Sequence, residues 1–449
     1  MNNTTNQADL IVSGRYVLPT WLHRDRIKDG AVAICNDTIL AIGSRNELLQ
    51  QFPQTPELHE PAGLIMPGLI NTHTHAPMSY LRGLADDLPL MAWLQEHIFP
   101  VEAELDSEMV YQSALLSIAE MIKSGTTSFC DMYLFAKEVA RAVDETGIRA
   151  WLGEALYDFP SPSYGKLENG FSYVRELFEH YEKHPLITIS VDPHSVYTCA
   201  PSQLQACGKL ALEYNALLVI HLSETDSEVD TCLQRYGVTP VQHLEKLGLL
   251  NERLLAAHCV KLNPDEIATL AKYQVKVSHC LESNMKLASG TAPVPELLQQ
   301  GITVSLGTDG PASNNDVDMF SEMSSVAKVH KVATLDPTVM NAETTLHCGT
   351  MGGASALAAE QQIGTLEAGK KADLIVLDLD QPHLTPIYNI PSHLVYCARG
   401  SDVIHSIING RLVMKNRQLL SIDEEKVIGE MKKIAQKVLK IKEKTGARR

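Results

Sequence analysis

Two histidines separated by one residue, His73 and His75, are the side chains of this sequence best suited to bind a metal ion. They follow a short apolar run at 64–70, which is typical of a buried strand. Alternate residues of an extended strand point to the same side, so both imidazoles can reach one ion. Imidazole suits zinc and neighbouring divalent metals, and a catalytic site needs further ligands and one position for water. Taken alone, such a pair is more often two ordinary loop histidines, so this interpretation depends on the rest of the chain.

Apolar runs of strand length alternate with helical stretches through the middle of the chain, the pattern of βα units around a parallel sheet. There are eight: 64–70, 127–132, 149–155, 187–191, 217–221, 254–259, 275–279 and 302–307. Eight such units predict a TIM barrel, in which the active site lies at the carboxyl ends of the strands. The polar side chains at these ends are His73 and His75, Asp131, Glu154, His194, His221 with Glu224, His258, His279 and Asp309.

Four of these side chains complete a metal-dependent site. His221 would supply a third imidazole and Asp309 a carboxylate oxygen, and the remaining position would take water, whose pKa a metal lowers towards neutrality. Glu224, three residues after His221, would keep an oxygen free to give and take a proton. His258 could hydrogen-bond the water or the developing tetrahedral centre. Singly, Glu224 is more often a surface carboxylate and His258 as often a core histidine, but the combination favours an active site.

The two ends of the chain have the pattern of short strands. The run 31–42 turns at Asn36-Asp37, 372–378 is apolar, and 405–414 turns at Asn409-Gly410. We therefore predict that 1–66 and 369–422 assemble one small β-sandwich beside a barrel domain at 67–368.

A C-terminal helix and tail are predicted at 423–449. Apolar residues recur there every three or four positions, which places them on one face of a helix: Val427, Met431, Ile434, Val438 and Ile441. The lysines of this segment also fit a membrane-surface helix, but the acidic remainder of the chain favours a packed helix with solvated lysines.

The composition excludes several classes of partner. The 449 residues include 38 basic and 54 acidic side chains, for a net charge of -16, which repels nucleic acid and anionic membranes. No signal peptide and no apolar run of membrane-spanning length is evident, and the nine cysteines form no CxxC pair. We predict a cytoplasmic protein with free thiols that acts on a small neutral or cationic molecule.

With these residues in place, the sequence resembles a known family. The motifs that carry the resemblance are Pro67-Gly-Leu-Ile-Asn-Thr-His-Thr-His-Ala-Pro-Met78, His221-Leu-Ser-Glu224, Ala257-His-Cys259 and Gly307-Thr-Asp-Gly-Pro-Ala-Ser-Asn-Asn315. Over about residues 8–425 the chain resembles the amidohydrolase superfamily, and within it the 5-methylthioadenosine/S-adenosylhomocysteine deaminases. The resemblance implies a TIM barrel with a small β-sandwich, one Zn²⁺ (Fe²⁺ or Mn²⁺ being alternatives) and a homo-oligomer. It also implies hydrolytic deamination of the adenine ring of a nucleoside to hypoxanthine, with release of ammonia.

The resemblance also assigns roles to residues. The metal ligands would be His73, His75, His221 and Asp309, and the catalytic groups would be Glu224, His258 and Asp309. The substrate-binding residues would be Trp93, Glu102, His194, Glu224 and Asp309, with Glu102 holding the ribose hydroxyls. Without the resemblance, Trp93 is a core residue and Glu102 a solvated one. The two-metal branch of the superfamily uses a modified lysine after the fourth strand, and its absence here favours one ion.

One departure from the family concerns the substrate tail. Members that accept a homocysteine tail bind its carboxylate with arginines after the third strand, where this chain offers Glu154 and, further on, Lys166. A lysine lacks the bidentate fork of arginine. The sequence therefore favours methylthioadenosine over S-adenosylhomocysteine.

Other interpretations stay open at this stage. A guanine or pterin deaminase or a triazine chlorohydrolase could use the same site, and so could a catalytically silent metal-binding protein. The role of His279 is open, and Ser313 and Asn314 could either cap a helix or reach the active site.

Overall fold

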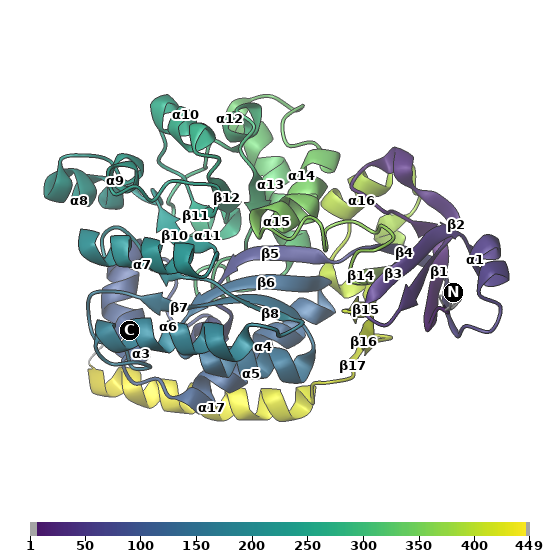
Figure 1. Ribbon diagram of the computed structural model, residues 1–449, viewed down its shortest axis with the longest axis horizontal. Coiled ribbons are helices and arrows are strands. Elements are labelled where there is room, and N and C mark those ends of the chain that lie inside the picture. The colour runs from purple at the N-terminus through teal and green to yellow at the C-terminus, as the bar shows by residue number, and fades with distance from the viewer. Residues whose placement is uncertain (1–6, 446–449) are drawn as a thin grey trace.

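Parallel strands form two sheets in the middle of the computed structural model, which describes residues 7–445 (Figure 1). The first contains β5 (Leu69–Thr74), β6 (Thr126–Tyr133), β7 (Arg149–Leu156) and β8 (Ile187–Ile189), with β9 (Asp192–Pro193) paired to β7. The second contains β10 (Leu218–Leu222), β11 (Leu254–His258), β12 (Lys276–His279) and β13 (Val304–Leu306). Most of these strands are buried along their whole length, which explains their nearly continuous apolar sequences. The architecture is a TIM-barrel-like α/β fold.

The first predicted strand is corrected by the structure. The run 64–70 is not one strand, because β4 (Glu57–Pro67) ends at Pro67 and β5 begins at Leu69. Proline has no N–H to continue a ladder. At Gly68 a Cβ atom would lie 2.0 Å from Thr127 Oγ1, so only glycine fits at the break. As a consequence, His73 lies within β5 and His75 directly follows it.

The two parallel sheets contact each other at both edges. Isolated parallel bridges join Val191 to Leu218 and Ser195 to His221. At the opposite edges, the backbone N–H of Asp309 donates to the carbonyl oxygen of His73 at 3.0 Å. These contacts bring the ends of β5, β9, β10 and β13 to one region.

Helices follow the strands along the chain (Figure 1). The α-helices are α1 (Arg45–Gln51), α2 (Leu90–Ala92), α3 (Phe99–Glu102), α4 (Ser107–Lys123), α5 (Ala136–Thr146), α6 (Leu167–Tyr181), α7 (Pro201–Glu213), α8 (Asp226–Tyr236), α9 (Pro240–Lys246), α10 (Pro264–Lys272), α11 (Leu281–Lys286), α12 (Val294–Gln299), α13 (Met319–Thr334), α14 (Ala342–Gly349), α15 (Met351–Ala356), α16 (Ile390–Tyr396) and α17 (Glu424–Thr445). A π-helical segment, η3 (Trp93–Ile98), connects α2 to α3, and 3₁₀ turns occupy η1 (His23–Asp25), η2 (Ala76–Leu81), η4 (Pro382–Leu384) and η5 (Gly400–Asp402).

Strands from both ends of the chain join in one eight-stranded sheet, seen at the right of Figure 1. Its order is β17 (Gln418–Leu419), β16 (Arg411–Lys415), β15 (Val403–Ile408), β14 (Leu374–Asp378), β4, β1 (Leu10–Val17), β2 (Ile27–Cys35) and β3 (Thr38–Ser44). The two hairpins turn at Asn36-Asp37 and at Asn409-Gly410, as predicted. The N- and C-terminal segments therefore do assemble together, whereas their division into a two-layer sandwich stays a prediction.

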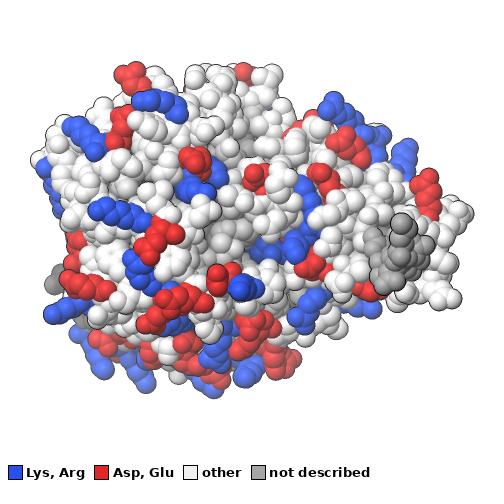
Figure 2. Space-filling model, in the orientation of Figure 1, with Lys and Arg blue, Asp and Glu red and all other residues white. Residues whose placement is uncertain are grey.

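The C-terminal helix α17 packs its apolar stripe against the barrel. Val427, Ile434, Val438 and Ile441 are buried and Met431 is partly buried, as the periodicity predicts. Along this edge of the molecule basic and acidic side chains alternate, which Figure 2 shows at the bottom of the view. The lysines of α17 are thus solvated and paired, as in the 2.7 Å contact of Lys433 with Glu430.

Within residues 7–445, none of the helices has the length and apolar character that crossing a bilayer requires.

Candidate active site

The carboxyl ends of the strands bring the predicted polar residues together. Three of these ends have a left-handed backbone, with φ of +51° at Ser223, +71° at His258 and +59° at Asp309. Side chains other than glycine rarely adopt this conformation, and such strain is concentrated at functional sites. These turns lie at or beside the predicted site residues of the fifth, sixth and eighth strands.

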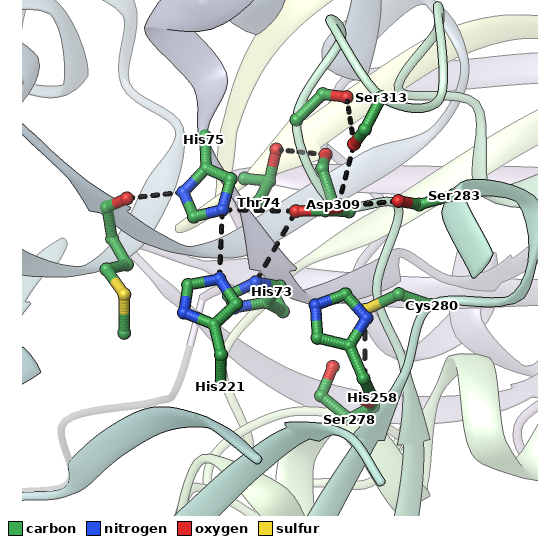
Figure 3. Close-up of polar contacts among 12 residues, drawn as sticks. His73, Thr74, His75, His221, His258, Ser278, Cys280, Ser283, Asp309 and Ser313 are labelled. Atoms are coloured by element: carbon green, nitrogen blue, oxygen red, sulfur yellow. Dashed lines mark hydrogen bonds and ion pairs between the residues drawn. The ribbon is translucent and has the colours of Figure 1, made fainter. Parts of the chain in front are cut away.

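A group of four buried side chains has the composition of a metal site. Ligand atoms of His73, His221, His258 and Asp309 all lie within 4.8 Å of one another. His75, which the sequence predicted as a ligand, lies beside this group, with its Nε2 3.1 Å from Asp309 Oδ1 and 3.2 Å from His221 Nε2. Five side chains therefore converge, from the ends of β5, β10, β11 and β13 (Figure 3).

Backbone carbonyl groups fix the orientation of two of these imidazoles. Nδ1 of His75 faces the carbonyl oxygen of Met132, and Nδ1 of His221 lies 2.7 Å from that of His194. A carbonyl oxygen only accepts hydrogen bonds, so each Nδ1 carries the proton and donates it. The Nε2 lone pairs of both rings then point into the centre of the cluster, as metal ligation requires.

The cluster fits a cation. Both ring nitrogens of the fully buried His73 lack a hydrogen-bond partner in the part of the chain that the structure describes, and its Nε2 points towards Asp309 Oδ1 at 3.5 Å. Burial lowers the pKa of His73 to about 4, so its imidazole is neutral and its lone pair is free. Burial alone would raise the pKa of Asp309, but the imidazoles of His73 and His75 beside its carboxylate hold this pKa well below the ordinary value. Burial lowers the pKa of His221 as well. Burial also opposes the charged form of His75, but its hydrogen bond with Asp309 raises the pKa of His75 to about 9, so this imidazole releases a proton when it binds a metal. Imidazoles around an ionised carboxylate are the donor set that zinc and similar divalent metals bind.

Two serines hold the aspartate in place. The hydroxyl groups of Ser283 and Ser313 each donate to Asp309 Oδ2 at 2.7 Å, leaving Oδ1 to face the histidines (Figure 3). Ser313 thus reaches the site, whereas the Asn314 amide donates to the carbonyl oxygen of Thr308 at 2.9 Å. Of the two alternatives left open by the sequence, Ser313 follows the second, whereas Asn314 follows neither, because Asp318 caps the next helix, α13.

A carboxyl group adjoins the cluster next to one of its imidazoles, His258. Glu224 Oε2 lies 3.9 Å from His258 Nε2, and Glu224 Oε1 accepts from the hydroxyl of Ser289 at 3.3 Å. Burial raises the pKa of Glu224, which brings a carboxyl group towards the range in which it can both give and take a proton. His258 Nδ1 contacts Asn284 Oδ1 at 2.9 Å. This pair can handle protons next to the metal-ligand group.

A pocket with a volume of about 660 Å³ opens above the cluster. Its floor includes Glu224, His258 and Asp309, and its walls are largely apolar. Trp93 and Glu102 enter it from η3 and α3, while His194 enters after the fourth strand. The structure therefore brings all five predicted substrate-binding residues to one cavity.

The sequence missed several residues of this site. Asn284 contacts His258, and the hydroxyl of Tyr133 donates to Glu102 Oε1 at 2.6 Å. Asn284 lies in a helix after the seventh strand and Tyr133 lies next to the end of the second, so their positions alone could have suggested both. Two residues considered from the sequence lie elsewhere: Lys166 is exposed outside the pocket, and His279 is paired with His330 through Nε2 atoms 3.0 Å apart.

A TIM-barrel-like fold with histidines and an aspartate at its strand ends, beside an acid–base pair and an open pocket, defines the class of metal-dependent hydrolases. The chain belongs to the amidohydrolase family, whose model matches residues 64–413.

Similar proteins extend over nearly the whole chain. The chain is 52% identical to the 5-methylthioadenosine/S-adenosylhomocysteine deaminase of Syntrophobacter fumaroxidans, covering 97% of this chain and 99% of that protein. It is 49% identical to 5-methylthioadenosine/S-adenosylhomocysteine deaminase 1 of Syntrophus aciditrophicus, covering 96% and 98%. Among solved structures, an adenosine deaminase from Xanthomonas campestris with bound zinc is 37% identical, with a TM-score of 0.95 over 97% of this chain and 99% of that one.

Proposed function

We propose that this protein deaminates the adenine ring of 5′-methylthioadenosine, giving 5′-methylthioinosine and ammonia, and that it also accepts S-adenosylhomocysteine and adenosine. The observation that carries the proposal is the position of Glu224 on the pocket floor, beside His258 and the other side chains of the candidate metal group. The relatives that are 52% and 49% identical bear the name of this activity and support the choice of substrate.

We also propose that His73, His75, His221 and Asp309 hold one ion, which is zinc, with Fe²⁺ or Mn²⁺ as alternatives. The zinc-bound structural neighbour supports this metal. When bound, a divalent ion supplies a Lewis acid that lowers the pKa of a water molecule. His258 then remains outside the ligand set, free to act on that water or on the substrate.

The protein's own groups move the protons. Asp309 and His258 align the attacking water and accept its proton, while Glu224 protonates the ring nitrogen next to C6. As the water oxygen adds to C6, the ring gains the proton from Glu224. A second proton, delivered to the exocyclic amine, then allows the C6–N bond to break, so that ammonia leaves and a carbonyl oxygen remains on the ring.

The pocket wall would orient the nucleoside. Glu102 would accept hydrogen bonds from the two ribose hydroxyls, and Tyr133 already donates to its Oε1. Trp93 would form a wall of the site, and His194 would contact the nucleoside. These roles agree with the position of all three residues along the pocket.

At the level of the whole molecule, we infer that the two parallel sheets close into one barrel at 67–368. We also infer that 1–66 and 369–422 form a small β-sandwich, with a helix and tail at 423–449. The bridges between Val191 and Leu218 and between Ser195 and His221 support barrel closure. We propose a cytoplasmic homo-oligomer that binds no nucleic acid, and the nine free thiols support a reducing compartment.

A substrate panel tests the proposal. Zinc-loaded protein is assayed with methylthioadenosine, S-adenosylhomocysteine and adenosine, following ammonia release and the ultraviolet change from adenine to hypoxanthine. Guanine, a pterin and a chlorotriazine serve as competing substrates, and Glu224→Gln is the matched inactive control. Turnover of methylthioadenosine that chelation removes and zinc restores is the expected result. Turnover confined to the competing substrates would overturn it.

A further inference from the structure

A second groove adjoins the candidate active-site pocket. It has a volume of about 920 Å³ and shares Leu90, Phe99 and Tyr197 with the pocket, so the two cavities lie side by side. Five of its side chains come from α8 and its N-cap: Thr225, Ser227, Glu228, Thr231 and Arg235. A substrate bound in the pocket can therefore extend into a region of different chemistry.

The groove carries opposite charges, and the amide group of Gln203 donates to Asp158 Oδ1. Arg235 is its one basic side chain among the described residues, and Asp158 is an exposed carboxylate on it. The guanidinium of Arg235 donates through Nη1 to the carbonyl oxygen of Tyr197 at 2.9 Å, and it forms no ion pair with any residue in 7–445. The other carboxylate, Glu228, already accepts from the backbone N–H groups of Ser223 and Glu224 at 3.0 and 2.7 Å.

The walls of the pocket offer no lysine or arginine to a substrate carboxylate. None of the side chains that line it within the described residues is lysine or arginine, and Lys166 lies outside it. A substrate tail that bears a carboxylate would therefore find its partner only beyond the pocket. Arginine suits this role because its planar fork binds a carboxylate through two N–H groups.

We propose that this groove is a subsite for an amino-acid tail, in which Arg235 binds the carboxylate and Asp158 binds the ammonium group. The inference rests on the proposed deamination of adenine nucleosides and names the residues that admit a tail such as homocysteine. It replaces the expectation from the sequence that Lys166 is the only candidate. The tail would pass Tyr197, whose backbone already contacts Arg235.

The test compares substrates in Arg235→Gln, which keeps an N–H group for the carbonyl of Tyr197 but removes the charge. A charge-assisted hydrogen bond is worth about tenfold to a hundredfold in affinity. We expect the ratio of kcat/KM for S-adenosylhomocysteine to that for methylthioadenosine to fall by about this factor, through a higher KM. Asp158→Asn should lower the same ratio. A 5′-butylthio analogue of adenosine, whose tail has no charge, serves as the control substrate. Its kcat/KM should stay unchanged if the variants remove only the recognition of charge, and it should fall if they change the shape of the groove.

Matched variants provide the controls. Arg253→Ala removes an arginine from a separate groove and should leave the ratio unchanged. An unchanged ratio in Arg235→Gln, an equal loss for the butylthio analogue, or a loss in Lys166→Ala instead would overturn the subsite. If the wild-type protein turns over methylthioadenosine but not S-adenosylhomocysteine, the subsite proposal is also wrong. The proposed deamination of methylthioadenosine then still stands. If no adenine nucleoside is turned over, the proposed function itself fails.

Discussion

At the scale of single residues, the site contains one carboxylate that is suited to accept a proton and one carboxyl group that is suited to donate one. Asp309 is ionised and fixed by two serine hydroxyls, whereas burial raises the pKa of Glu224. The pKa values of two carboxyl groups in one pocket are thus shifted in opposite directions by their surroundings. Such a difference divides the acid and base roles at neutral pH.

Replacing Glu224 with glutamine should abolish turnover while leaving metal content intact. Glutamine keeps the size of the side chain but cannot exchange a proton, and general acid–base groups contribute about 10²- to 10⁴-fold to the rate. Steady-state kinetics and elemental analysis of the purified variant measure both quantities. Near-normal kcat would mean that another group carries the proton.

Asn284 positions His258 rather than reacting itself. Its Oδ1 lies 2.9 Å from His258 Nδ1, so Asn284→Ala should lower kcat about 10- to 100-fold through loss of the imidazole orientation. KM should change little, because the side chain does not line the pocket. Asn284→Ser, which keeps a hydroxyl oxygen as acceptor, should recover part of kcat. A loss confined to KM would contradict this role.

At the scale of elements, the ends of the strands determine where the polar side chains of the site lie. The break at Gly68 ends β4 and starts β5, which places His73 inside the strand and His75 after it. The left-handed turns at Ser223, His258 and Asp309 redirect the chain where the polar side chains must converge. The sequence indicated the strands, but it could not show these local changes of direction.

The helix α17 offers a matched pair of residues for a stability test. Val438 is 1% exposed and its neighbour Leu439 is 55% exposed. Val438→Ala should lower the free energy of unfolding by about 2 kcal/mol, since it leaves a cavity in the packed face. Leu439→Ala should change it by less than about 0.5 kcal/mol. Denaturant unfolding measures both, and equal effects would mean that α17 does not pack as described.

At the scale of the whole molecule, a buried ion pair joins the parallel sheets to the sheet formed by the chain ends. Arg149, at the start of β7, donates to Asp373 Oδ2 at 2.6 Å, and both side chains are nearly inaccessible. Asp373 Oδ1 also accepts from the backbone N–H of Asn409 at 2.7 Å. The ion pair therefore links two residues that are 224 positions apart in the sequence.

Asp373→Ala should destabilise the protein strongly. It leaves the guanidinium of Arg149 buried without its partner, which costs about 3–5 kcal/mol of unfolding free energy. The double variant Arg149→Met/Asp373→Leu should recover part of that loss. Lys433→Ala, which breaks an exposed pair with Glu430, is the control and should cost less than about 1 kcal/mol. If Asp373→Ala and Lys433→Ala lowered the free energy of unfolding equally, burial of the Arg149–Asp373 pair would be unimportant.

The sequence by itself indicated seven of the eight strands to within a few residues, the hairpin turns at the chain ends, the apolar face of α17 and the types of residue at the strand ends. Its first strand, 64–70, was wrong because it ran across the break at Gly68. These follow from local periodicity and from the chemistry of each side chain, which short stretches of sequence contain. The family resemblance followed from the same short motifs.

Only the tertiary structure decided which atoms meet. It placed His258 in the group of metal-ligating side chains and His75 beside it, gave His258 its contact with Asn284, and paired His279 with His330. It also brought Asp158 and Arg235 to one groove. These contacts join residues far apart in the chain, and they depend on the packing of whole strands and helices, which no local pattern of residues specifies.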